Sequence, residues 1–331
     1  MRDSLERAAR ALKRVASVTV ATHVDPDGDA IGSLLGIALI LKGMGKKVVA
    51  RWQKNMTFPP QYEFLPGREM ISELPGNADA FVVLDCGSFN RLGDLVAEAK
   101  RHPHLINIDH HPDNDLFGTI NVVEGRASST SEMVYDFAKL AKAEIGKQAA
   151  LCLYVGLLTD TGKFQYSNTT ARSHLIAADL IGEGRIDVAD TFCKVYEQLS
   201  FGSLKLLASV ISGAVLRAES GLVYSVATRK LIDETGGKLE ELENLIDHLR
   251  SVKSADVAAL AKELPDGRFR ISLRSKGEID VSKIAREHGG GGHKNAAAFV
   301  ADGSLIENIS MIEDAVRGQK REIDGWSAGD R

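Results

Sequence analysis

The sequence predicts an α/β protein with a doubly wound, mainly parallel sheet and a second, smaller α/β domain. Short β-branched or apolar runs alternate with helix-like segments through the first half of the chain, which is typical of a parallel sheet. Two of these runs, 80–85 and 105–109, are almost continuously apolar and end in aspartate, as strands buried on both faces do. At about residue 205 this regular alternation ends, and we place the second domain there.

The elements of the first domain follow from hydrophobic periodicity and from helix-stopping residues. Apolar residues at helical spacing begin the chain, and Gly43 and Gly45 end the second helix. The segment 55–76 contains four prolines and is expected to be mostly loop. In order, we expect helices at 3–15, 30–43, 89–100, 128–143, 147–158 and 170–181, and strands at 17–22, 47–52, 80–85 and 105–109.

The second domain is expected to be smaller and to contain a hairpin. Two apolar runs flank Pro265-Asp266-Gly267, which is a turn sequence. We expect strands at 211–219, 222–228, 255–264 and 269–274, helices at 239–249, 280–287 and 304–318, and a loose tail from Gln319. The proposed divisions are a first domain at 1–184, a linker at 185–204 with a helix through 187–197, a second domain at 205–320 and a tail at 321–331.

Composition and charge limit the classes of function. The chain has 331 residues, 44% of them hydrophobic and 26% charged, as in an ordinary globular protein of two domains. Its net charge of −4 argues against a protein that binds long DNA or RNA, but a short phosphorylated substrate remains compatible. We expect no membrane span and no signal peptide. The three cysteines are widely spaced, which predicts buried free thiols and a cytoplasmic location.

The stretch from Thr22 to Ser33 is the strongest candidate for a functional site. His23, Asp25, Asp27 and Asp29 lie within seven residues, where a strand turns into a helix. Three carboxylates so close repel one another unless cations offset their charge. Imidazole together with carboxylate suits divalent Mn, Fe, Co or Zn, and Mg less well. The alternative is a polar turn in which Asp29 is the N-cap of the helix.

Three further segments bring acidic or imidazole side chains to the end of an apolar element. These are Asp85, the run Asp109-His110-His111, and Asp160. Each could be only a cap or turn residue, but parallel strands bring their carboxyl ends together. Such a cluster would hold two cations that share one carboxylate. A two-metal centre polarises a phosphoryl oxygen and generates hydroxide, so we expect phosphoester hydrolysis.

These motifs, in this order and spacing, resemble the DHH phosphoesterase superfamily. The matching elements are His-x-Asp-Pro-Asp-x-Asp-x-x-Gly-Ser, Asp85, Asp109-His110-His111 and Asp160, and Gly-Gly-Gly-Gly-His at 289–293 resembles the DHH-associated C-terminal domain. The resemblance covers about residues 10–320 and is greatest to the group of nanoRNA oligoribonucleases and 3′-phosphoadenosine 5′-phosphate (pAp) phosphatases. It implies a catalytic domain that binds two metals and a second domain that binds substrate.

The resemblance also implies roles for individual residues. One Mn ion would be held by His23, Asp27 and Asp85, and a second by Asp29, Asp85, His110 and Asp160. Mg or Co could replace Mn. Asp25 would orient a ligand or the attacking water, and Asp109 would fix the histidine tautomer. His111 would face the scissile phosphate, as an electrophile or as the proton donor to the leaving oxygen.

The candidate substrate-binding residues lie mostly in the second domain. Arg274 and Ser275 end a strand upstream of the glycine run, and an arginine fork suits a terminal phosphate. Open backbone amides at Gly291 and Gly292, with His293, would suit a phosphate or a sugar edge. The alternatives are a solvated arginine and a merely flexible glycine connection. Arg126, Ser128 and Ser129 of the first domain are further candidates.

The leading hypothesis is a cytoplasmic, metal-dependent phosphodiesterase that degrades RNA of two to five nucleotides and also removes the 3′-phosphate of pAp. The alternative enzyme hydrolyses linear dinucleotides such as pApA or pGpG, or cyclic dinucleotides. A different class is a regulatory protein that binds such nucleotides without turnover, which the complete set of ligands disfavours. The resemblance also makes a homodimer plausible.

Overall fold

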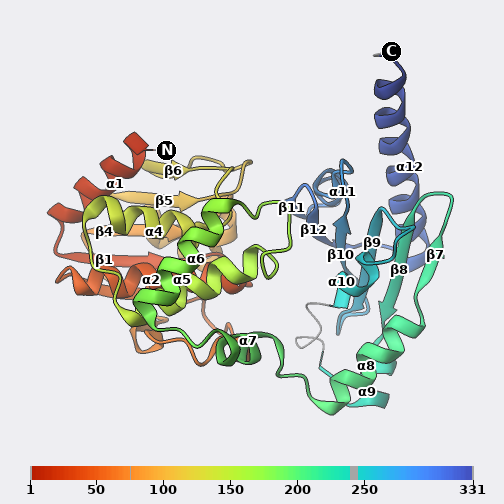
Figure 1. Ribbon diagram of the computed structural model, residues 1–331, viewed down its shortest axis with the longest axis horizontal. Coiled ribbons are helices and arrows are strands. Elements are labelled where there is room, and N and C mark those ends of the chain that lie inside the picture. Colours follow the sequence, from red (N-terminus) through yellow and green to blue (C-terminus); the bar gives the residue numbers. More distant parts are fainter. Residues whose placement is uncertain (1, 75, 239–244, 330–331) are drawn as a thin grey trace. The chain divides into compact units, whose positions relative to one another are not determined.

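The chain folds into two units, and the first is built on a six-stranded sheet whose strands are all parallel. The computed structural model describes residues 2–74, 76–238 and 245–329, and the chain divides into two units between Glu197 and Gln198 (Figure 1). With η for a 3₁₀ helix, the elements of the first unit are α1 (Arg2–Arg14), β1 (Ser17–Ala21), α2 (Gly28–Gly43), β2 (Lys47–Arg51), η1 (Pro60–Tyr62), η2 (Arg68–Met70), β3 (Ile71–Ser72), β4 (Ala80–Leu84), η3 (Phe89–Leu95), α3 (Val96–Ala99), β5 (Leu105–Asp109), β6 (Ile120–Val123), α4 (Thr130–Ala141), α5 (Lys147–Asp160), α6 (Ala171–Gly184) and α7 (Val188–Tyr196).

The strand order places the switch point of the sheet between β1 and β4. The order is β3-β2-β1-β4-β5-β6, so the chain winds outward in one direction from β1 and then in the other from β4. In a doubly wound sheet, ligands bind beyond the carboxyl ends of the strands at this point. The segments that carry His23 and Asp85 follow β1 and β4 directly. The expected doubly wound fold is confirmed.

The two faces of this sheet are covered unequally. The larger core packs α1, α2, α4, α5 and α6 against one face, where Val20, Val82 and Ile108 are fully buried. A smaller core packs η3 and α3 on the other face, against Phe81 and Val83. Because β4 is buried on both faces, all five of its residues are apolar and buried.

Four glycines let α2 and α5 approach each other closely. A Cβ added at Gly32 would lie 2.5 Å from the carbonyl oxygen of Cys152, and one at Gly28 would lie 2.4 Å from Oγ1 of Thr159. From α5, a Cβ added at Gly156 would lie 2.0 Å from Oγ of Ser131 and 2.8 Å from Oδ1 of Asp29. We call this contact, formed by Gly28, Gly32, Gly36 and Gly156, the glycine seam. It fixes the distance between the helices that carry Asp29 and Asp160.

The second unit contains a mixed sheet of six strands, in the order β11-β12-β10-β9-β8-β7. Only β8 and β9 pair in parallel, and the other neighbours are antiparallel. Its elements are α8 (Phe201–Ser212), β7 (Val215–Arg217), β8 (Leu222–Ala227), α9 (Arg229–Thr235), α10 (Leu245–Arg250), β9 (Val257–Glu263), β10 (Phe269–Ser275), α11 (Val281–Glu287), β11 (Gly291–His293), β12 (Ala296–Ala301) and α12 (Leu305–Gly329). The smaller α/β domain and the hairpin at 255–274 are confirmed.

Several expected elements differ in the first unit. The helix expected at 89–100 is mostly the 3₁₀ helix η3, because Gly93 adopts a left-handed φ of 55° inside it. The short strands β3 and β6 were not expected. The predicted linker at 185–204 contains α7 and the beginning of α8, and the division of the chain lies within it.

In the second unit, the strand expected from Ile211 is wrong at its start. That segment belongs to α8, whose N-cap Ser200 accepts a hydrogen bond from the backbone N–H of Ser203 and whose Leu206 and Val210 pack into the core. The loose tail is also wrong. Helix α12 continues to Gly329, since Gln319 donates to the backbone carbonyl of Asp280 and Lys320 pairs with Asp256 at 2.5 Å.

Other differences in the second unit concern short elements. Helix α9 and strand β12 were not expected. The helix expected at 239–249 is seen as α10 from Leu245, and residues 239–244 lie outside the described part of the chain. Among the described residues, no helix is both long enough and apolar enough to span a membrane.

Candidate metal centre

The loop after β1 places two aspartates at the start of α2. Asp27 is the N-cap, and its Oδ1 accepts hydrogen bonds from the backbone N–H groups of Asp29 (3.1 Å) and Ala30 (3.0 Å). The expected alternative, with Asp29 as the N-cap, is therefore wrong. Asp29 lies in the first helical turn and is 1% exposed, whereas Asp25 and Asp27 are exposed. Asp25 has a φ of 52°, so the chain turns sharply there.

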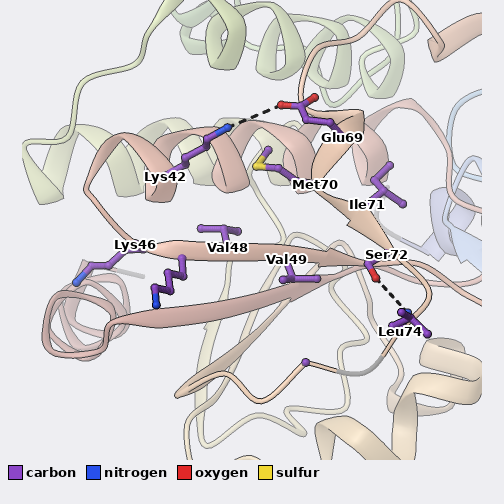
Figure 2. A pocket seen from close by; sticks show the side chains of 11 residues that line it. Lys42, Lys46, Val48, Val49, Glu69, Met70, Ile71, Ser72 and Leu74 are labelled. Atoms are coloured by element: carbon purple, nitrogen blue, oxygen red, sulfur yellow. Dashed lines mark hydrogen bonds and ion pairs between the residues drawn. The ribbon is translucent and has the colours of Figure 1, made fainter.

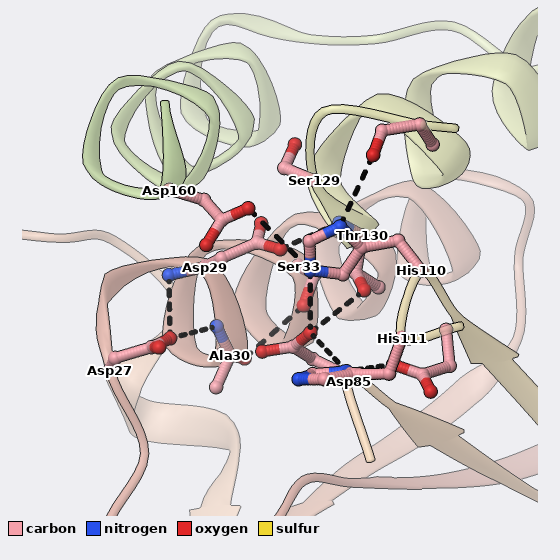
Figure 3. A network of polar contacts seen from close by, with 12 residues as sticks. Asp27, Asp29, Ala30, Ser33, Asp85, His110, His111, Ser129, Thr130 and Asp160 are labelled. Carbon is pink, nitrogen blue, oxygen red and sulfur yellow. Dashed lines mark hydrogen bonds and ion pairs between the residues drawn. The ribbon is translucent and has the colours of Figure 1, made fainter. Parts of the chain in front are cut away.

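Of the side-chain groups in the first unit that could hold a divalent cation, two consist entirely of predicted metal ligands, and Asp85 belongs to both. The first comprises His23, Asp27 and Asp85, and the second comprises Asp29, Asp85 and His110. In each group one ligand atom per residue lies within 4.8 Å of the others. Figure 3 shows the side chains of Asp29, Asp85, His110 and Asp160 pointing toward one another. All six side chains that the sequence suggested as metal ligands therefore lie together in one cluster.

The separations inside this cluster fit ligands around a metal ion. His23 Nε2 lies 3.6 Å from Asp85 Oδ2, and His110 Nε2 lies 3.6 Å from Asp85 Oδ1 and 3.5 Å from Asp160 Oδ2. Two ligands each about 2.1 Å from one ion are about 3.0–3.5 Å apart at tetrahedral or octahedral angles. The nitrogen and oxygen donors are thus spaced as shared ligands, with imidazole and carboxylate in the mixture that first-row divalent metals accept.

The N-terminus of α4 holds two of the carboxylates, a role that the sequence analysis missed. The backbone N–H groups of Thr130 and Ser131 donate to the two oxygens of Asp29, at 2.6 and 2.9 Å. Thr130 Oγ1 donates to Asp85 Oδ1 at 3.0 Å (Figure 3). Ser129 is the N-cap of α4 and accepts from the N–H of Glu132. This Ser-x-x-Glu spacing is the sequence signal that marks the helix start.

A series of hydrogen bonds links His111, Asp109 and Asn114, at the end of β5 and in the loop after it. His111 Nδ1 lies 2.7 Å from Asp109 Oδ1, and Asn114 donates to Asp109 Oδ2 at 2.6 Å. Asn114 also donates to the carbonyl of Cys86, which ties this loop to the one after β4. Asp109 is fully buried, and its carboxylate holds the Nδ1 side of the His111 ring.

Without cations, the cluster binds protons tightly. Burial opposes the charge on His110, but Asp160, Asp85 and Asp29 outweigh it and raise its pKa to about 9. Burial likewise opposes the charge on His111, yet the hydrogen bond to Asp109 and the charge of Asp85 raise its pKa to about 10. The crowded acids need positive charge, which protons supply here and cations can supply instead.

The pKa values of the buried carboxylates shift in opposite directions. Burial raises the pKa of Asp29 well above its usual range, and the charges of Asp85 and Asp160 add to the effect. Burial also raises the pKa of Asp160, to about 7. Burial disfavours the charge on Asp85 as well, but the hydrogen bond with His23 and the nearby histidines outweigh it and hold its pKa well below the usual range. Asp85 is therefore more firmly ionised than Asp29 or Asp160.

Asp160 is the last residue of α5, and Asn168 fixes its place. The side-chain amide of Asn168 donates to Oδ2 of Asp160 (3.3 Å), to its carbonyl (3.1 Å) and to the carbonyl of Ser128 (2.9 Å). Asn168 thereby joins the end of α5 to the start of α4. Of the other candidates, Ser128 is fully buried with its hydroxyl on Glu132 at 2.5 Å, and Arg126 is exposed.

In the second unit, the candidate residues lie on β10 and β11, which are separated by β12. Arg274 is half-buried and its Nε is buried without a hydrogen-bond partner. Ser275 is 2% exposed, and its hydroxyl donates to the carbonyl of Ile279 and accepts from Asn295. That hydroxyl therefore shapes the turn after β10. Arg274 pairs with Ala296 of β12, which in turn pairs with His293 of β11, and the backbone N–H of Ser275 donates to the carbonyl of Asn295.

The glycine run is packed rather than a free connection. A Cβ added at Gly290 would lie 2.1 Å from the carbonyl oxygen of Ala298, and Gly292 has a φ of 140°. Gly291, by contrast, is exposed and faces open space. Glycine is thus required at 290 and 292, because the short strand β11 lies very close to β12 there.

A separate hollow of about 570 Å³ lies away from the cluster, along β2 and the end of α2 (Figure 2). It is lined by Lys42, Lys46, Lys47 and Glu69, among others. Lys42 and Glu69 form a loose ion pair at 3.9 Å, and Lys46 donates to the carbonyl of Val15. Asp29 and Lys42 lie at opposite ends of α2, which is about 24 Å long. None of the predicted site residues lines this hollow.

The cysteines are free thiols. Cys86 and Cys152 are buried as expected, whereas Cys193 is half-buried and its Sγ donates to Glu197, so its expected burial is wrong. Burial raises the pKa of the Cys86 thiol to about 12, so this thiol stays protonated beside the cluster.

Comparison with known proteins now identifies the family. Residues 17–157 match the DHH family, N-terminal domain, and residues 220–318 match the DHHA1 domain. The bifunctional oligoribonuclease and PAP phosphatase NrnA of Thermus thermophilus is 33% identical over 95% of this chain and 94% of its own length. The chain belongs to the DHH family. The NrnA of Bacillus subtilis is a further DHH relative, 28% identical over 83% of this chain and 86% of its own.

Solved structures agree with this family. An exopolyphosphatase-related protein from Bacteroides fragilis has a TM-score of 0.89 and 27% identity, and the match covers 98% of each chain. An exonuclease RecJ bound to manganese has a TM-score of 0.52 and 15% identity, over 96% of this chain and 94% of that one, which shows a common fold. The expected membership of the DHH superfamily is confirmed.

Proposed function

We propose that this DHH protein is a metal-dependent phosphodiesterase that hydrolyses RNA of two to five nucleotides to mononucleotides and removes the 3′-phosphate of pAp. The observation that supports the proposal most is the position of Asp85 in two groups of ligands, because a shared carboxylate is the feature of a two-metal phosphoesterase. The names of the two NrnA relatives give the class of substrate.

The proposed cofactors are two divalent cations, with Mn preferred and Mg or Co possible. His23, Asp27 and Asp85 would hold one ion, and the second would be held by Asp29, Asp85, His110 and Asp160. When bound, the ions supply a polarised phosphoryl oxygen and a hydroxide nucleophile. Histidine ligands favour Mn over Mg, which prefers oxygen donors.

The proposed proton donor is His111. Its Nδ1 lies 2.7 Å from Asp109 Oδ1, and the proposal assigns the contact with the substrate to its other ring nitrogen. That nitrogen would donate a proton to the leaving oxygen or stabilise charge on the phosphate. Asp109, held by Asn114, keeps the ring in one orientation, and Asp25 orients a ligand or the attacking water.

The second unit is proposed to bind the substrate. Arg274 would hold a terminal phosphate, and the strand Gly291–His293 would offer backbone N–H groups and an imidazole to a phosphate or sugar. Ser275 supports this surface through its bond to Ile279. Within the first unit, Arg126 is exposed and is the best placed of the three remaining candidates, because the hydroxyls of Ser128 and Ser129 already bond Glu132. The homodimer and the cytoplasmic location stay predictions.

Product analysis tests this function directly. The purified protein is incubated with pApA, pGpG, RNAs of two to five nucleotides, pAp and pyrophosphate, each with Mn or with Mg. We expect mononucleotides from the short RNAs and AMP from pAp, faster with Mn. Turnover of the linear dinucleotides alone would support the alternative enzyme. Ligand binding without any turnover would make the chain a nucleotide-sensing regulator and would contradict the proposal.

A further inference from the structure

Arg91 lies beside the candidate metal centre and has no role in the function described so far. It is the third residue of η3, close behind the loop that begins at Asp85. Its backbone N–H donates to the carbonyl of Ser88 (3.0 Å), and its own carbonyl accepts from the N–H of Val24 (2.8 Å). The main chain at Arg91 is therefore anchored to both loops that supply ligands of the first proposed ion, one after β1 and one after β4.

The backbone around Arg91 is held on its other side as well. Gln53, which follows β2, donates to the carbonyl of Leu92 at 2.6 Å and accepts from the N–H of Asp94 at 3.2 Å. The intervening Gly93 has a φ of 55°, and a Cβ there would lie 2.6 Å from Oε1 of Gln53. The position of Arg91 is thus fixed by its neighbours, while the residue itself is exposed.

The guanidinium points to the ligands and not to a carboxylate. Its NH2 lies 3.0 Å from Nδ1 of His23, and it is near enough to interact electrostatically with His111 and Cys86. Among the described residues, no ion pair joins this guanidinium to a carboxylate, although the neighbouring cluster contains the four aspartates Asp27, Asp29, Asp85 and Asp160. An arginine at the rim of an acidic site without an acidic partner has its hydrogen-bonding capacity available for a ligand.

The hydrogen bond between Arg91 and His23 is not compatible with His23 binding a metal ion through Nε2. Nδ1 has two neighbours, the Arg91 guanidinium and the carbonyl of Val24 at 2.6 Å. Arginine only donates and a carbonyl only accepts, so a neutral imidazole can satisfy one of them at a time. A ring that binds an ion through Nε2 carries its proton on Nδ1 and donates it to Val24. Arg91 then has no acceptor on His23.

We propose that Arg91 binds a phosphate oxygen of the substrate at the metal centre. This inference rests on the proposed function and adds a substrate-binding residue to it. A phosphodiester anion must approach a rim that carries the exposed carboxylates of Asp25 and Asp27. A guanidinium on this anchored main chain offsets their repulsion and offers two parallel N–H donors to one phosphate.

The test compares Arg91→Ala and Arg91→Lys with Arg101→Ala, which removes an exposed arginine from the end of α3 in the same unit. With pApA and Mn, we expect kcat/KM to fall about 10- to 100-fold in Arg91→Ala, as loss of one charge-assisted hydrogen bond predicts. Arg91→Lys, which keeps the charge without the fork, falls less. Arg101→Ala stays close to the wild type.

Calorimetry gives a readout apart from turnover. AMP, the expected product, is titrated into each Mn-saturated protein, and Mn is titrated into each metal-free protein. We expect Arg91→Ala to bind AMP about tenfold more weakly and to bind Mn at least as tightly, because a competing cation has been removed from the rim.

Each other outcome has a definite meaning. Unchanged kcat/KM and AMP affinity in Arg91→Ala would overturn the inference. Weaker Mn binding with unchanged AMP affinity would make Arg91 a support for His23 and would overturn it too. If the wild type hydrolyses no substrate in the panel, the proposed function fails, but the AMP titrations still decide the role of Arg91. A wild type that binds no AMP counts against it.

Discussion

The sheets of the two units each have six strands, but they bring side chains together in different ways. In the parallel sheet, β1, β4 and β5 all end at one edge, so residues as distant in sequence as His23, Asp85 and His110 meet there. In the mixed sheet, neighbouring strands mostly run in opposite directions, and the candidates Arg274 and His293 pair with the same residue, Ala296 of β12, from its two sides. The first arrangement suits a buried cluster of ligands, whereas the second presents a half-exposed surface.

The metal-ligand cluster of the first unit and the candidate residues of the second unit also differ in their electrostatics. The cluster of the first unit is buried and its groups shift each other's pKa values strongly, which is typical of a catalytic centre. In the second unit, the hydroxyl of Ser275 bonds Ile279, and two of the glycines serve close packing. The first region is therefore expected to determine whether any reaction occurs, and the second to determine which substrate is accepted. Four experiments test this division.

The largest effect is expected from Asp85→Asn. The amide keeps the shape but loses the charge that both ligand groups share, so we expect at least about a thousandfold loss of kcat and loss of bound metal. Metal analysis and steady-state kinetics measure the two effects. The control is Asp94→Asn, an exposed aspartate in η3, which should leave both unchanged. Retention of both ions by Asp85→Asn would contradict the shared role.

Next, Gly156→Ala tests the glycine seam. The added methyl group would collide with Oγ of Ser131 and press on Asp29, so we expect about 2 kcal/mol of destabilisation together with weaker metal binding. Gly182→Ala is the matched control, since a Cβ at this helical position in α6 meets nothing within 4 Å and should stabilise slightly. Urea unfolding of both variants gives the comparison. Equal stabilities would show that the seam is not tightly packed.

A smaller effect is expected in the second unit. Arg274→Ala should raise KM about tenfold for 5′-phosphorylated dinucleotides and much less for the unphosphorylated ones, with little change in kcat. Its metal content should equal that of the wild type. A uniform effect on both substrates would remove the terminal phosphate as the partner of Arg274, and a loss of metal would break the division between the two regions.

The mildest test varies pH. The pKa of His110 is raised to about 9 and that of Asp160 to about 7, so protons stabilise the metal-free fold below these values and this contribution is lost as pH rises through them. Cations need the deprotonated groups. Apparent Mn affinity should therefore rise about tenfold per pH unit between about pH 7 and 9. The increase in Tm caused by Mn measures this, and an increase that shrinks with pH would contradict it.

The sequence was most informative where one run of residues indicated both a secondary-structure element and a functional side chain at its end. Runs such as 80–85 and 105–109 specified both a buried strand and the acid at its end, so the ligand groups could be predicted from order along the chain. The role of Thr130 was not predictable in the same way. Its contacts with Asp29 and Asp85 come from the N-terminus of a helix that lies over the site, and nothing local in the sequence reports that packing.

The elements that were missed or wrongly predicted also depend on contacts outside the segment itself. Strands β3 and β6 are short and mostly half-buried, so their pairing depends on neighbours in the sheet rather than on periodicity. The segment at Ile211 is apolar enough for a strand, but the cap at Ser200 starts a helix that buries Leu206. The polar residues after 318 looked loose because their anchors, Asp280 and Asp256, lie far away in sequence.

The glycine seam also determines what the chain is like before any ion arrives. With α2 and α5 in contact along their length, Asp29 and Asp160 are held by the core itself, and α4 is tied to Asp29 by two backbone hydrogen bonds. A small metal-folded domain must order its chain when it takes up its ion, whereas this one is already ordered. We therefore expect the amide protons of α2 to exchange with solvent at nearly the same slow rate with and without metal.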